Sequence, residues 1–386
     1  MAKVPVRVFW YCEKWQPGGI QAVQMNLMKH IDPARVKFDI GVSEDDTDLF
    51  DAQLEACGAR KLVSLNRRYD SPGRRTLANI LAVGRLIRSG RYEAVHFNAC
   101  HGVELIYLFW AWLYRVPMRI VHCRNNDIGA GGRSRRIKLL AHAVCRRMFG
   151  GFANVRLANS TLAMDWLYTK RTIKAGRVRV LNNGIEAQRY AFSKEKRDEV
   201  RRGLGLDGKF VVGHVGHFNY QKNHEFLLEI FREIAQAEPE ARLLLVGAGE
   251  REQEMRARAR EYGIYDRVIF AGATNHVPEY MWAMDAFVLP SRFEGFGNVL
   301  IEAQAAGLKC FASKNVIPDA VRITGNLEWI SLDSGAAAWA EQILALRSGY
   351  ARENRVQDVI RAGYDIHAMA EWLEKLYCGE VQGDAL

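Results

Sequence analysis

Short apolar runs alternate with longer helical segments along the whole chain, and this alternation constrains the fold more than any other feature. In the first half, runs typical of strands occur at Val6–Tyr11, Phe38–Val42, Ala94–Phe97, Met118–His122, Val155–Ala158 and Val178–Leu181. Segments with helical character, such as Ile20–Ile31 and Arg75–Ser89, lie between them. Short buried strands that alternate with helices are typical of parallel sheets. The pattern therefore predicts an α/β fold built from doubly wound sheets.

The alternation stops at a charged segment, Glu186–Asp207, and then begins again. Further strands are indicated at Phe210–Val215, Arg242–Val246, Val268–Phe270, Ala286–Leu289 and Leu308–Ala312, with helices at His224–Ala237, Glu250–Tyr262 and Asn298–Ala306. A chain of 386 residues is long for one domain and comfortable for two. We therefore predict two doubly wound domains joined near residue 190. Because ligands of such folds bind at the carboxyl ends of the strands, two facing domains predict a cleft.

Charge is distributed unevenly between the two halves. Residues 1–190 contain 31 Lys and Arg against 15 Asp and Glu, whereas the remaining residues contain 23 against 29. A basic half predicts an acidic partner, which is either nucleic acid or a surface of anionic lipid headgroups. No recognised nucleic-acid-binding module and no basic tract interleaved with aromatic residues is evident, so we expect no nucleic acid partner.

Composition indicates a globular protein of the cytoplasm. Hydrophobic residues make up 49% and charged residues 25%, which excludes a disordered chain, a collagen and a coiled coil. No apolar stretch reaches the ~18 to 20 residues of a membrane span, and Val8–Cys12 is too short for a signal peptide. The seven cysteines include no Cys-x-x-Cys pair, which indicates reduced thiols rather than disulfides or a zinc site.

One basic segment, Arg133–Phe149, has two interpretations. Its apolar residues at helical spacing are Ile137, Leu140, Ala141, Val144 and Met148, and Arg135, Arg136, Lys138, Arg146 and Arg147 surround them. The first interpretation is a surface-lying helix that contacts the anionic inner leaflet of the cell membrane. The second is an ordinary amphipathic helix that covers the sheet of its own domain.

The most informative stretch, Pro290–Ala303, combines a strand end, a loop and a helix start near Gly297. Such a helix start supplies free backbone N–H groups and about half a positive charge, which together favour an anion. Glu294 precedes the helix and Glu302 lies inside it, and carboxylates can accept sugar hydroxyls. The stretch therefore predicts a site for a polyol attached to phosphate. The alternative is that both glutamates are simply solvated.

A glycosidase pair is disfavoured for these two glutamates. Eight residues of helix span about 12 Å. The two carboxyl groups of a glycosidase lie roughly 5 to 9.5 Å apart.

Two other turns have the composition of phosphate-binding loops. Gly213–His224 follows a strand, precedes a helix and contains His217 and Lys222, which could neutralise and hydrogen-bond a phosphate. Gln16–Ile20 carries Gly18 and Gly19, which would let backbone approach a ligand closely. Taken alone, Gly213–His224 is better explained as an ordinary surface turn, and a plain turn explains Gln16–Ile20 at least as well.

Taken together, these stretches resemble the motifs of the retaining glycosyltransferases of family four, which have the GT-B fold. The run from Glu294 to Glu302 is similar to the family's E-x7-E motif, and Gly216–Asn223 is similar to its G-R-x-x-x-x-K-N turn. Further similarities are those of Leu181–Glu186 to P-N-G-I-D, Ala158–Ser160 to A-x-S, Leu245–Glu250 to L-V-G-x-G, and Gly18–Gly19 to the glycine loop. The motifs occur in family order along almost the whole chain. The resemblance is strongest to transferases of bacterial capsule, exopolysaccharide or O-antigen synthesis.

The resemblance implies an architecture and a reaction. Two Rossmann-like domains are expected, at residues 1–190 on the acceptor side and at 191–365 for the nucleotide sugar, with a C-terminal helix at 366–386 that packs back on the first. The reaction would transfer a sugar from a nucleoside-diphosphate sugar, preferably a UDP-sugar, to a glycan or lipid-linked glycan acceptor, with retention of configuration. No cofactor and no metal are expected, since no Asp-x-Asp motif stands in the usual strand-end context.

The resemblance also assigns roles by position. Glu302 would hold the nucleotide ribose, Lys222 and Asn223 would bind the diphosphate, and Glu294 would hold the donor sugar. The remaining donor-binding positions would be Gly18 and Gly19 in the first domain and Gly295, Phe296, Gly297, Asn298 and Val299 at the helix start.

The chain departs from the family at two positions. His217 stands where the family usually has Arg, so a permanent charge is replaced by one that depends on pH. The family also has a His after the strand that precedes the catalytic loop of the first domain. Either His122 or Arg124 occupies that place, and our register puts Arg124 there. Both are therefore candidates for the group beside the anomeric carbon.

Two further classes of function remain open beside a transferase. Another GT-B enzyme, such as a hydrolysing epimerase, would need an acid–base carboxylate and a His in the cleft. A non-catalytic scaffold is favoured only by the change at His217 and disfavoured by Lys222, Glu294 and Glu302. A dinucleotide oxidoreductase is weaker still, because Gly247-x-Gly249 continues into Glu250 rather than a third Gly.

Overall fold

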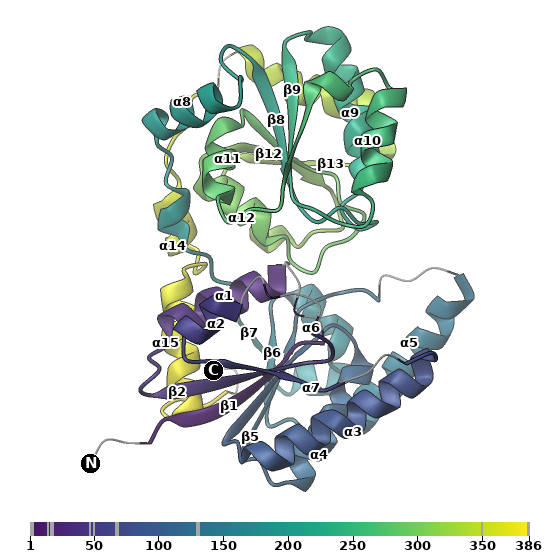
Figure 1. The fold of residues 1–386 in the computed structure, drawn as a ribbon, viewed down its shortest axis with the longest axis vertical. Coiled ribbons are helices and arrows are strands. Elements are labelled where there is room, and N and C mark those ends of the chain that lie inside the picture. Colours follow the sequence, from purple (N-terminus) through teal and green to yellow (C-terminus); the bar gives the residue numbers. More distant parts are fainter. Residues whose placement is uncertain are drawn as a thin grey trace. The chain divides into compact units, whose positions relative to one another are not determined.

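A computed structural model describes residues 4–13, 15, 19–45, 48, 51–65, 69–128, 132–348 and 350–383. The chain forms two compact units (Figure 1). The first comprises residues 1–184 together with 366–386, and the second comprises 185–365. The division after Gly184 lies slightly before the expected boundary at residue 190, because η3 (Ala187–Tyr190) packs against helices of the second unit. The expected terminal segment 366–386 belongs to the first unit.

The first unit is built on a parallel sheet of seven strands, in the order β3-β2-β1-β4-β5-β6-β7. The strands are β1 (Val6–Tyr11), β2 (Val36–Val42), β3 (Arg60–Val63), β4 (Ala94–Ala99), β5 (Met118–Cys123), β6 (Val155–Ala158) and β7 (Arg179–Val180). The helices are α1 (Gly19–His30), α2 (Asp51–Ala56), α3 (Pro72–Gly90), α4 (Tyr107–Leu113), α5 (Gly132–Phe149), α6 (Thr161–Leu167), α7 (Lys170–Lys174) and α15 (Ile366–Tyr377). The doubly wound parallel arrangement expected from the alternation is confirmed.

The second unit has a parallel sheet of six strands, in the order β10-β9-β8-β11-β12-β13. The strands are β8 (Phe210–Val215), β9 (Ala241–Val246), β10 (Val268–Gly272), β11 (Ala286–Leu289), β12 (Lys309–Ser313) and β13 (Leu327–Ile330). The helices are α8 (Lys194–Gly203), α9 (His224–Ala237), α10 (Glu252–Glu261), α11 (Val277–Ala283), α12 (Asn298–Ala305), α13 (Gly335–Leu344) and α14 (Val356–Arg361).

Two edge strands, β3 and β13, were not predicted from the sequence. β3 has no fully buried residue, and only the two ends of β13 are buried. An edge strand contacts one neighbour and is partly solvated, so it lacks the continuous apolar run that marks a central parallel strand. The central strands β1 and β4 are, by contrast, almost entirely buried.

α15 completes the core of the first unit. Ile366, Met369, Leu373 and Tyr377 belong to the same buried cluster as residues of β1, α1 and β2. The Tyr377 hydroxyl lies 2.6 Å from Nδ1 of His96 in β4. The last helix of the chain therefore packs against its first strands.

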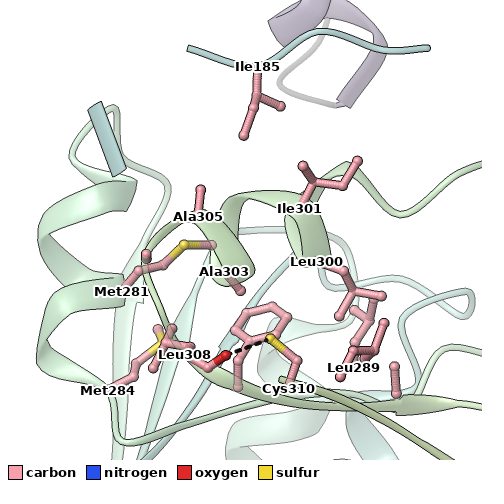
Figure 2. Close-up of a cluster of buried hydrophobic side chains, with 14 of the residues drawn as sticks. Ile185, Met281, Met284, Leu289, Leu300, Ile301, Ala303, Ala305, Leu308 and Cys310 are labelled. Atoms are coloured by element: carbon pink, nitrogen blue, oxygen red, sulfur yellow. Dashed lines mark hydrogen bonds between the residues drawn. The ribbon is translucent and has the colours of Figure 1, made fainter. Parts of the chain in front are cut away.

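α12 packs against the sheet of the second unit through buried side chains. Figure 2 shows its side chains Leu300, Ile301, Ala303 and Ala305 in the same buried cluster as Leu289 of β11, together with Leu308 and Cys310. The alanines add little bulk, so the helix can approach the sheet closely. This packing positions the β11–α12 loop, which contains Glu294.

No helix in the described part of the chain is long and apolar enough to span a membrane.

A charged network ties α8 to the sheet of the second unit. Arg197 and Arg201 of α8 bond to the two carboxylate oxygens of Asp285, at 2.6 and 3.3 Å. Asp285 also accepts the backbone N–H of Val211 at 2.7 Å. Arg201 is buried, and burial lowers the pKa of its guanidinium. Asp285 therefore compensates a charge that would be costly to leave alone.

Asp285→Ala is expected to destabilise the second unit by about 3 kcal/mol, because it leaves a buried guanidinium without its carboxylate. In a unit of this size, that change lowers the midpoint of thermal unfolding by roughly 6 to 12 °C. Differential scanning calorimetry of the full chain measures it. Asp198→Ala is the matched control, since the Lys194–Asp198 pair is exposed and should leave the midpoint unchanged. Equal midpoints for the two variants would contradict this account.

Candidate functional site

Two loops of the second unit lie at the carboxyl ends of neighbouring strands. One follows β8 and runs from Gly216 to Asn223, and the other follows β11 and runs from Pro290 to Gly297. β8 pairs with β9 on one side and with β11 on the other, so the direction of winding reverses here. A reversal of this kind opens a crevice at the carboxyl edge, where doubly wound sheets bind ligands.

Lys222 and Glu294 join these loops through an ion pair. Lys222 Nζ donates to Glu294 Oε1 at 2.6 Å, and both side chains are largely buried. Ser291 Oγ donates to the same oxygen at 2.7 Å, and Gln221 Nε2 donates to Glu294 Oε2 at 3.1 Å. Each oxygen of Glu294 is therefore bonded, and the carboxylate is held in one orientation between two loops.

Further bonds fix the two loops against each other. Asn223 Nδ2 donates to the carbonyl of Pro290 at 3.0 Å, and the backbone N–H of Arg292 donates to the carbonyl of Gln221 at 2.8 Å. Asn223 has a positive φ of 57°, which ends the turn and starts α9. The loop conformation is therefore set before any ligand arrives.

Gly247, which follows β9, lets its backbone pass close to the backbone of Gly216 in the loop after β8. Its φ is +141°, and a Cβ there would lie 2.1 Å from the carbonyl oxygen of Gly216. A side chain at Gly247 would therefore push the β8 loop away from its position.

The predicted helix start lies where expected. α12 begins at Asn298, directly after Gly297, and Val299 is partly buried against the core. Gly295 is buried, and the ring of buried Phe296 packs 5.8 Å from that of Tyr364. Glu294, Gly295, Phe296 and Gly297 thus form a rigid approach to the first turn of α12, whose N–H groups favour an anion.

Glu302 lies one helix turn beyond this start, next to Tyr190 of η3. Burial raises the pKa of its carboxyl to about 7, while a hydrogen bond from Tyr190 and the charge of Lys222 lower it. The side chain keeps some exposure. The charge of the Glu302 carboxyl therefore changes near neutral pH. Glu302 also lies close enough to Lys222 for the positive charge of Lys222 to lower its pKa.

His217 lies at the start of the β8 loop and is half-exposed. Its Nε2 is 3.1 Å from a carboxylate oxygen of Glu250, at the end of the β9 loop. The carboxylate of Glu250 thus lies beside His217, the position at which the glycosyltransferases that the sequence resembles usually have Arg.

The side chains that support Lys222 and Glu294 were not predicted from the sequence. Gln221 is adjacent to Lys222 in the chain, and Ser291 precedes Glu294 by three residues, a spacing at which a hydroxyl can reach a carboxylate. Two buried histidines also lie under the loop: His214 and His224 are in ring contact at 4.7 Å, and His224 stacks on Phe218 at 4.1 Å. Burial lowers the pKa of His214 to about 3, so it packs as a neutral ring.

In the first unit, Arg124 is buried and directly follows the last residue of β5. Its Nε donates to Asn98 Oδ1 at 2.9 Å and its Nη1 donates to Asn183 Oδ1. Its Nη2 has no partner among the described residues, and no carboxylate there lies within ion-pair distance. Burial lowers the pKa of the guanidinium to about 10, which leaves it charged at neutral pH. Arg124 is thus a buried cation held by two neutral amides.

His122 has a different environment from Arg124. It lies within β5, is fully buried and stacks on His96 with the ring centroids 5.5 Å apart. Burial lowers its pKa well below the usual value for histidine. The strand therefore holds His122 inside the unit, whereas Arg124 stands at the strand's carboxyl end.

The predicted glycine loop is only partly within the described residues. Gly19 is the first residue of α1, whereas Gly18 lies outside the described part of the chain. Among the described residues, no group of three or more His, Cys, Asp or Glu side chains is arranged to hold a metal ion.

Two family models match the chain. One, described as a glycosyl transferase 4-like domain, matches residues 18–184, and the other, described as glycosyl transferases group 1, matches residues 209–348. The two matches fall on the first and second units respectively. The second match covers all six strands of the second sheet, and the first covers β2 to β7 of the first sheet.

Several curated relatives are glycosyltransferases by name. EpsF of Bacillus subtilis is 29% identical over 354 residues, which are 90% of this chain and 90% of EpsF. An α-1,3-galactosyltransferase of Escherichia coli, named for UDP-Gal and GlcNAc-diphosphoundecaprenol, is 24% identical over 246 residues, or 61% of this chain and 62% of the relative. The lipopolysaccharide core mannosyltransferase LpsB of Rhizobium meliloti is 30% identical over 140 residues, 35% of this chain and only 40% of LpsB.

Solved structures share the architecture of the whole chain. HepE of Anabaena, in complex with UDP and glucose, has a TM-score of 0.74 at 19% identity, covering 96% of this chain and 98% of HepE. Sucrose-phosphate synthase of Thermosynechococcus elongatus has a TM-score of 0.74 at 19% identity, covering 97% and 99%. These likenesses show the fold, and the two family models name the group: this chain has the GT-B fold and belongs to the family-four glycosyltransferases.

Proposed function

We propose that this chain is a retaining, metal-independent glycosyltransferase that moves a sugar from a UDP-sugar to a hydroxyl of a lipid-linked glycan in bacterial cell-surface polysaccharide synthesis. The observation that carries the proposal is the Lys222–Glu294 pair, held at the reversal point of the second sheet beside the start of α12. A cation, a fixed carboxylate and a helix start within two adjoining loops suit a diphosphate attached to a sugar.

The names of relatives support the parts of this proposal that geometry leaves open. HepE is described in complexes with UDP and with UDP-glucose, which favours a uridine nucleotide. The relatives from Escherichia coli and Campylobacter jejuni are named for acceptors on diphosphoundecaprenol, which favours a lipid-linked acceptor. LpsB and a Vi polysaccharide protein of Salmonella typhi favour surface-polysaccharide synthesis in a bacterium. Such an enzyme would work in the cytoplasm, at the inner face of the cell membrane.

Donor binding would rearrange the existing ion pair. Lys222 would turn its charge toward the diphosphate, with Asn223, His217 and the N–H groups from Gly295 to Val299 around it. Glu294 would then be free to accept hydroxyls of the donor sugar, while Ser291 and Gln221 keep its carboxylate in place. Glu302 would accept the ribose hydroxyls, and Gly18 and Gly19 would shape the loop over the diphosphate.

The chemical step would depend on positioning and charge. The sugar would pass through an oxocarbenium-like state, and the acceptor hydroxyl would attack from the face that the diphosphate leaves. Because the acceptor attacks the sugar directly, the protein need supply no nucleophile. Because the leaving diphosphate would take the acceptor's proton, the protein need supply no base. Lys222 and the helix start would stabilise the charge that develops on the diphosphate. Arg124, rather than the enclosed His122, would lie beside the sugar and contribute a fixed positive charge.

A panel of nucleotides tests the donor site. UDP is expected to raise the midpoint of thermal unfolding equally with and without EDTA, and GDP, ADP and CMP to have smaller effects. Ligand at 100 times its dissociation constant stabilises a fold by about 2.7 kcal/mol. No shift with any nucleotide would count against the proposal, and a shift lost in EDTA would overturn metal independence.

Lys222→Gln is expected to weaken UDP binding by roughly tenfold to a hundredfold, because a charge-assisted contact to phosphate contributes about 1.5 to 3 kcal/mol. Isothermal titration calorimetry measures the loss. Lys309→Gln is the matched control, since Lys309 pairs with Glu328 at 2.6 Å and is similarly buried, but lies in β12. Equal affinity in the two variants would exclude Lys222 from the diphosphate site.

The raised pKa of Glu302 predicts that the affinity for UDP increases with pH. If the ionised carboxylate holds the ribose, a pKa of about 7 means that UDP affinity rises roughly tenfold from pH 6 to pH 8. UDP itself titrates in this range, so the reference is Glu302→Gln, in which the contribution of the carboxyl is absent. Calorimetric titrations at both pH values should show a steeper rise for the natural chain. Parallel pH profiles would remove Glu302 from the ribose site.

Stereochemistry separates a retaining transferase from the alternatives. With an α-linked UDP-sugar and an accepted glycan, proton NMR of the product should show an α linkage. A β linkage would contradict retention. Release of free sugar without transfer would favour a hydrolase instead.

A further inference from the structure

α5 packs against the first unit with its polar side. His142 is buried: its Nδ1 accepts the backbone N–H of Gly102 at 2.9 Å, and its Nε2 donates to the carbonyl of Trp166 at 3.1 Å. Arg146 donates to the same carbonyl at 2.8 Å, and Arg135 pairs with Asp127 at 2.7 Å. The inward face of α5 therefore bonds to the unit through histidine and arginine, and the ring of Phe149 at its end packs against the hydrophobic core.

Gly102 makes this packing unusually close. It begins η1 (Gly102–Ile106), and a Cβ there would lie 2.4 Å from the carbonyl oxygen of His142. The backbone of α5 thus rests directly on η1. The orientation of the helix about its own axis is fixed by this contact together with the bonds of His142 and Arg146.

The opposite side of α5 presents an apolar stripe to solvent. Ile137, Leu140, Val144 and Met148 are 71%, 67%, 45% and 63% exposed. Leu140, Val144 and Met148 follow each other at intervals of four, so they lie along one line of the helix, and Ile137 lies beside them. This is the reverse of an ordinary surface helix, which turns its apolar stripe toward the core. Of the two interpretations of Arg133–Phe149, the ordinary amphipathic helix with its apolar residues against its own sheet is therefore wrong.

The exposed stripe is bordered by cations, and an aromatic cluster surrounds Phe152, three residues after the end of α5. Arg136 and Arg147 are exposed and lie four and seven residues from Leu140, on the same side of the helix. α5 contains no acidic residue. Beyond its end, the ring of Phe152 lies 5.0 Å from that of half-exposed Trp112, which stands beside half-exposed Leu113 in α4. α5 lies at the outer edge of its unit in Figure 1.

We propose that the α5 face, formed by Ile137, Leu140, Val144 and Met148 with Arg136 and Arg147 beside them, docks the protein on the anionic surface of a lipid bilayer. The apolar stripe enters the boundary between headgroups and acyl chains, and the arginines contact lipid phosphates. Trp112 adds an amphipathic ring of the kind that favours this boundary. The positive charge around the stripe favours an anionic bilayer over a second copy of the chain, because two α5 faces in contact would bring their arginines together. The inference deepens the proposed function, since a lipid-linked acceptor is reached at such a surface.

Flotation of the full chain with vesicles tests the proposal. Vesicles of 30% phosphatidylglycerol in phosphatidylcholine should bind the natural chain, whereas pure phosphatidylcholine should bind it far less. Leu140→Glu/Val144→Glu should weaken binding at least tenfold, because two charges enter the stripe. Arg136→Gln/Arg147→Gln should weaken it roughly thirtyfold, at about 1 kcal/mol for each basic residue near the surface.

Two matched controls assign the effect to this face. Leu77→Glu/Leu81→Glu changes two exposed leucines at the same spacing on α3, and Lys170→Gln/Arg171→Gln removes two exposed charges from α7. Both should bind vesicles like the natural chain. Losses equal to those of the α5 variants would overturn the assignment to α5.

Two other measurements separate this proposal from its rivals and from the proposed function. The UDP-induced thermal shift should be unchanged in all α5 variants, so a failed donor site and a failed docking face give different results. Sedimentation velocity without lipid should show the same monomeric species for the natural chain and the stripe variant. Self-association that the stripe variant abolishes, without vesicle binding, would overturn the bilayer in favour of a second copy.

Discussion

The candidate site depends on one contact between two loops, the ion pair between Lys222 and Glu294. β8 and β11 are far apart in sequence but adjacent in the sheet, so their loops meet at one edge. Three side-chain bonds, from Lys222 and Gln221 to Glu294 and from Asn223 to Pro290, and one backbone bond, from Arg292 to Gln221, then fix the loops before any ligand is present. Preorganisation of this kind is what a diphosphate site needs, because the charge that develops on a leaving group is stabilised without rearranging the surroundings.

Much of the second unit could be predicted because its signals are local. Each central parallel strand is a short continuous apolar run, and the turns after β8 and β11 carry Gly, Lys and Glu at characteristic spacings. The supporting residues were harder to find, since Ser291 and Gln221 matter only through a bond to Glu294 that forms in space. The raised pKa of Glu302 could not be predicted from the sequence either, because burial next to Tyr190 is a property of the packed unit. β3 and β13 lacked any strong signal, being short and partly solvated.

α5 illustrates a different limit of sequence reasoning. Periodicity placed a helix at Arg133–Phe149 and identified its apolar stripe, and the structure has a helix there. Periodicity alone could not say which side faces the sheet, because both orientations share one pattern. Gly102 and the bonds of His142 decide it, and both come from contacts between elements. The same limit applies to Arg124: its position after a strand was readable, whereas its enclosure by two asparagine amides was not.

The position of α15 has a consequence for how the molecule is made. The bond between His96 and Tyr377 joins residues 281 positions apart. A ribosome that adds roughly 5 to 20 residues each second needs about a quarter to a whole minute to span that interval. During this time the first sheet lacks the helix that covers part of it, and the whole second unit is synthesised within the same interval. The half that is made first is therefore finished last, and its apolar surface must be protected from misassembly until the final helix emerges.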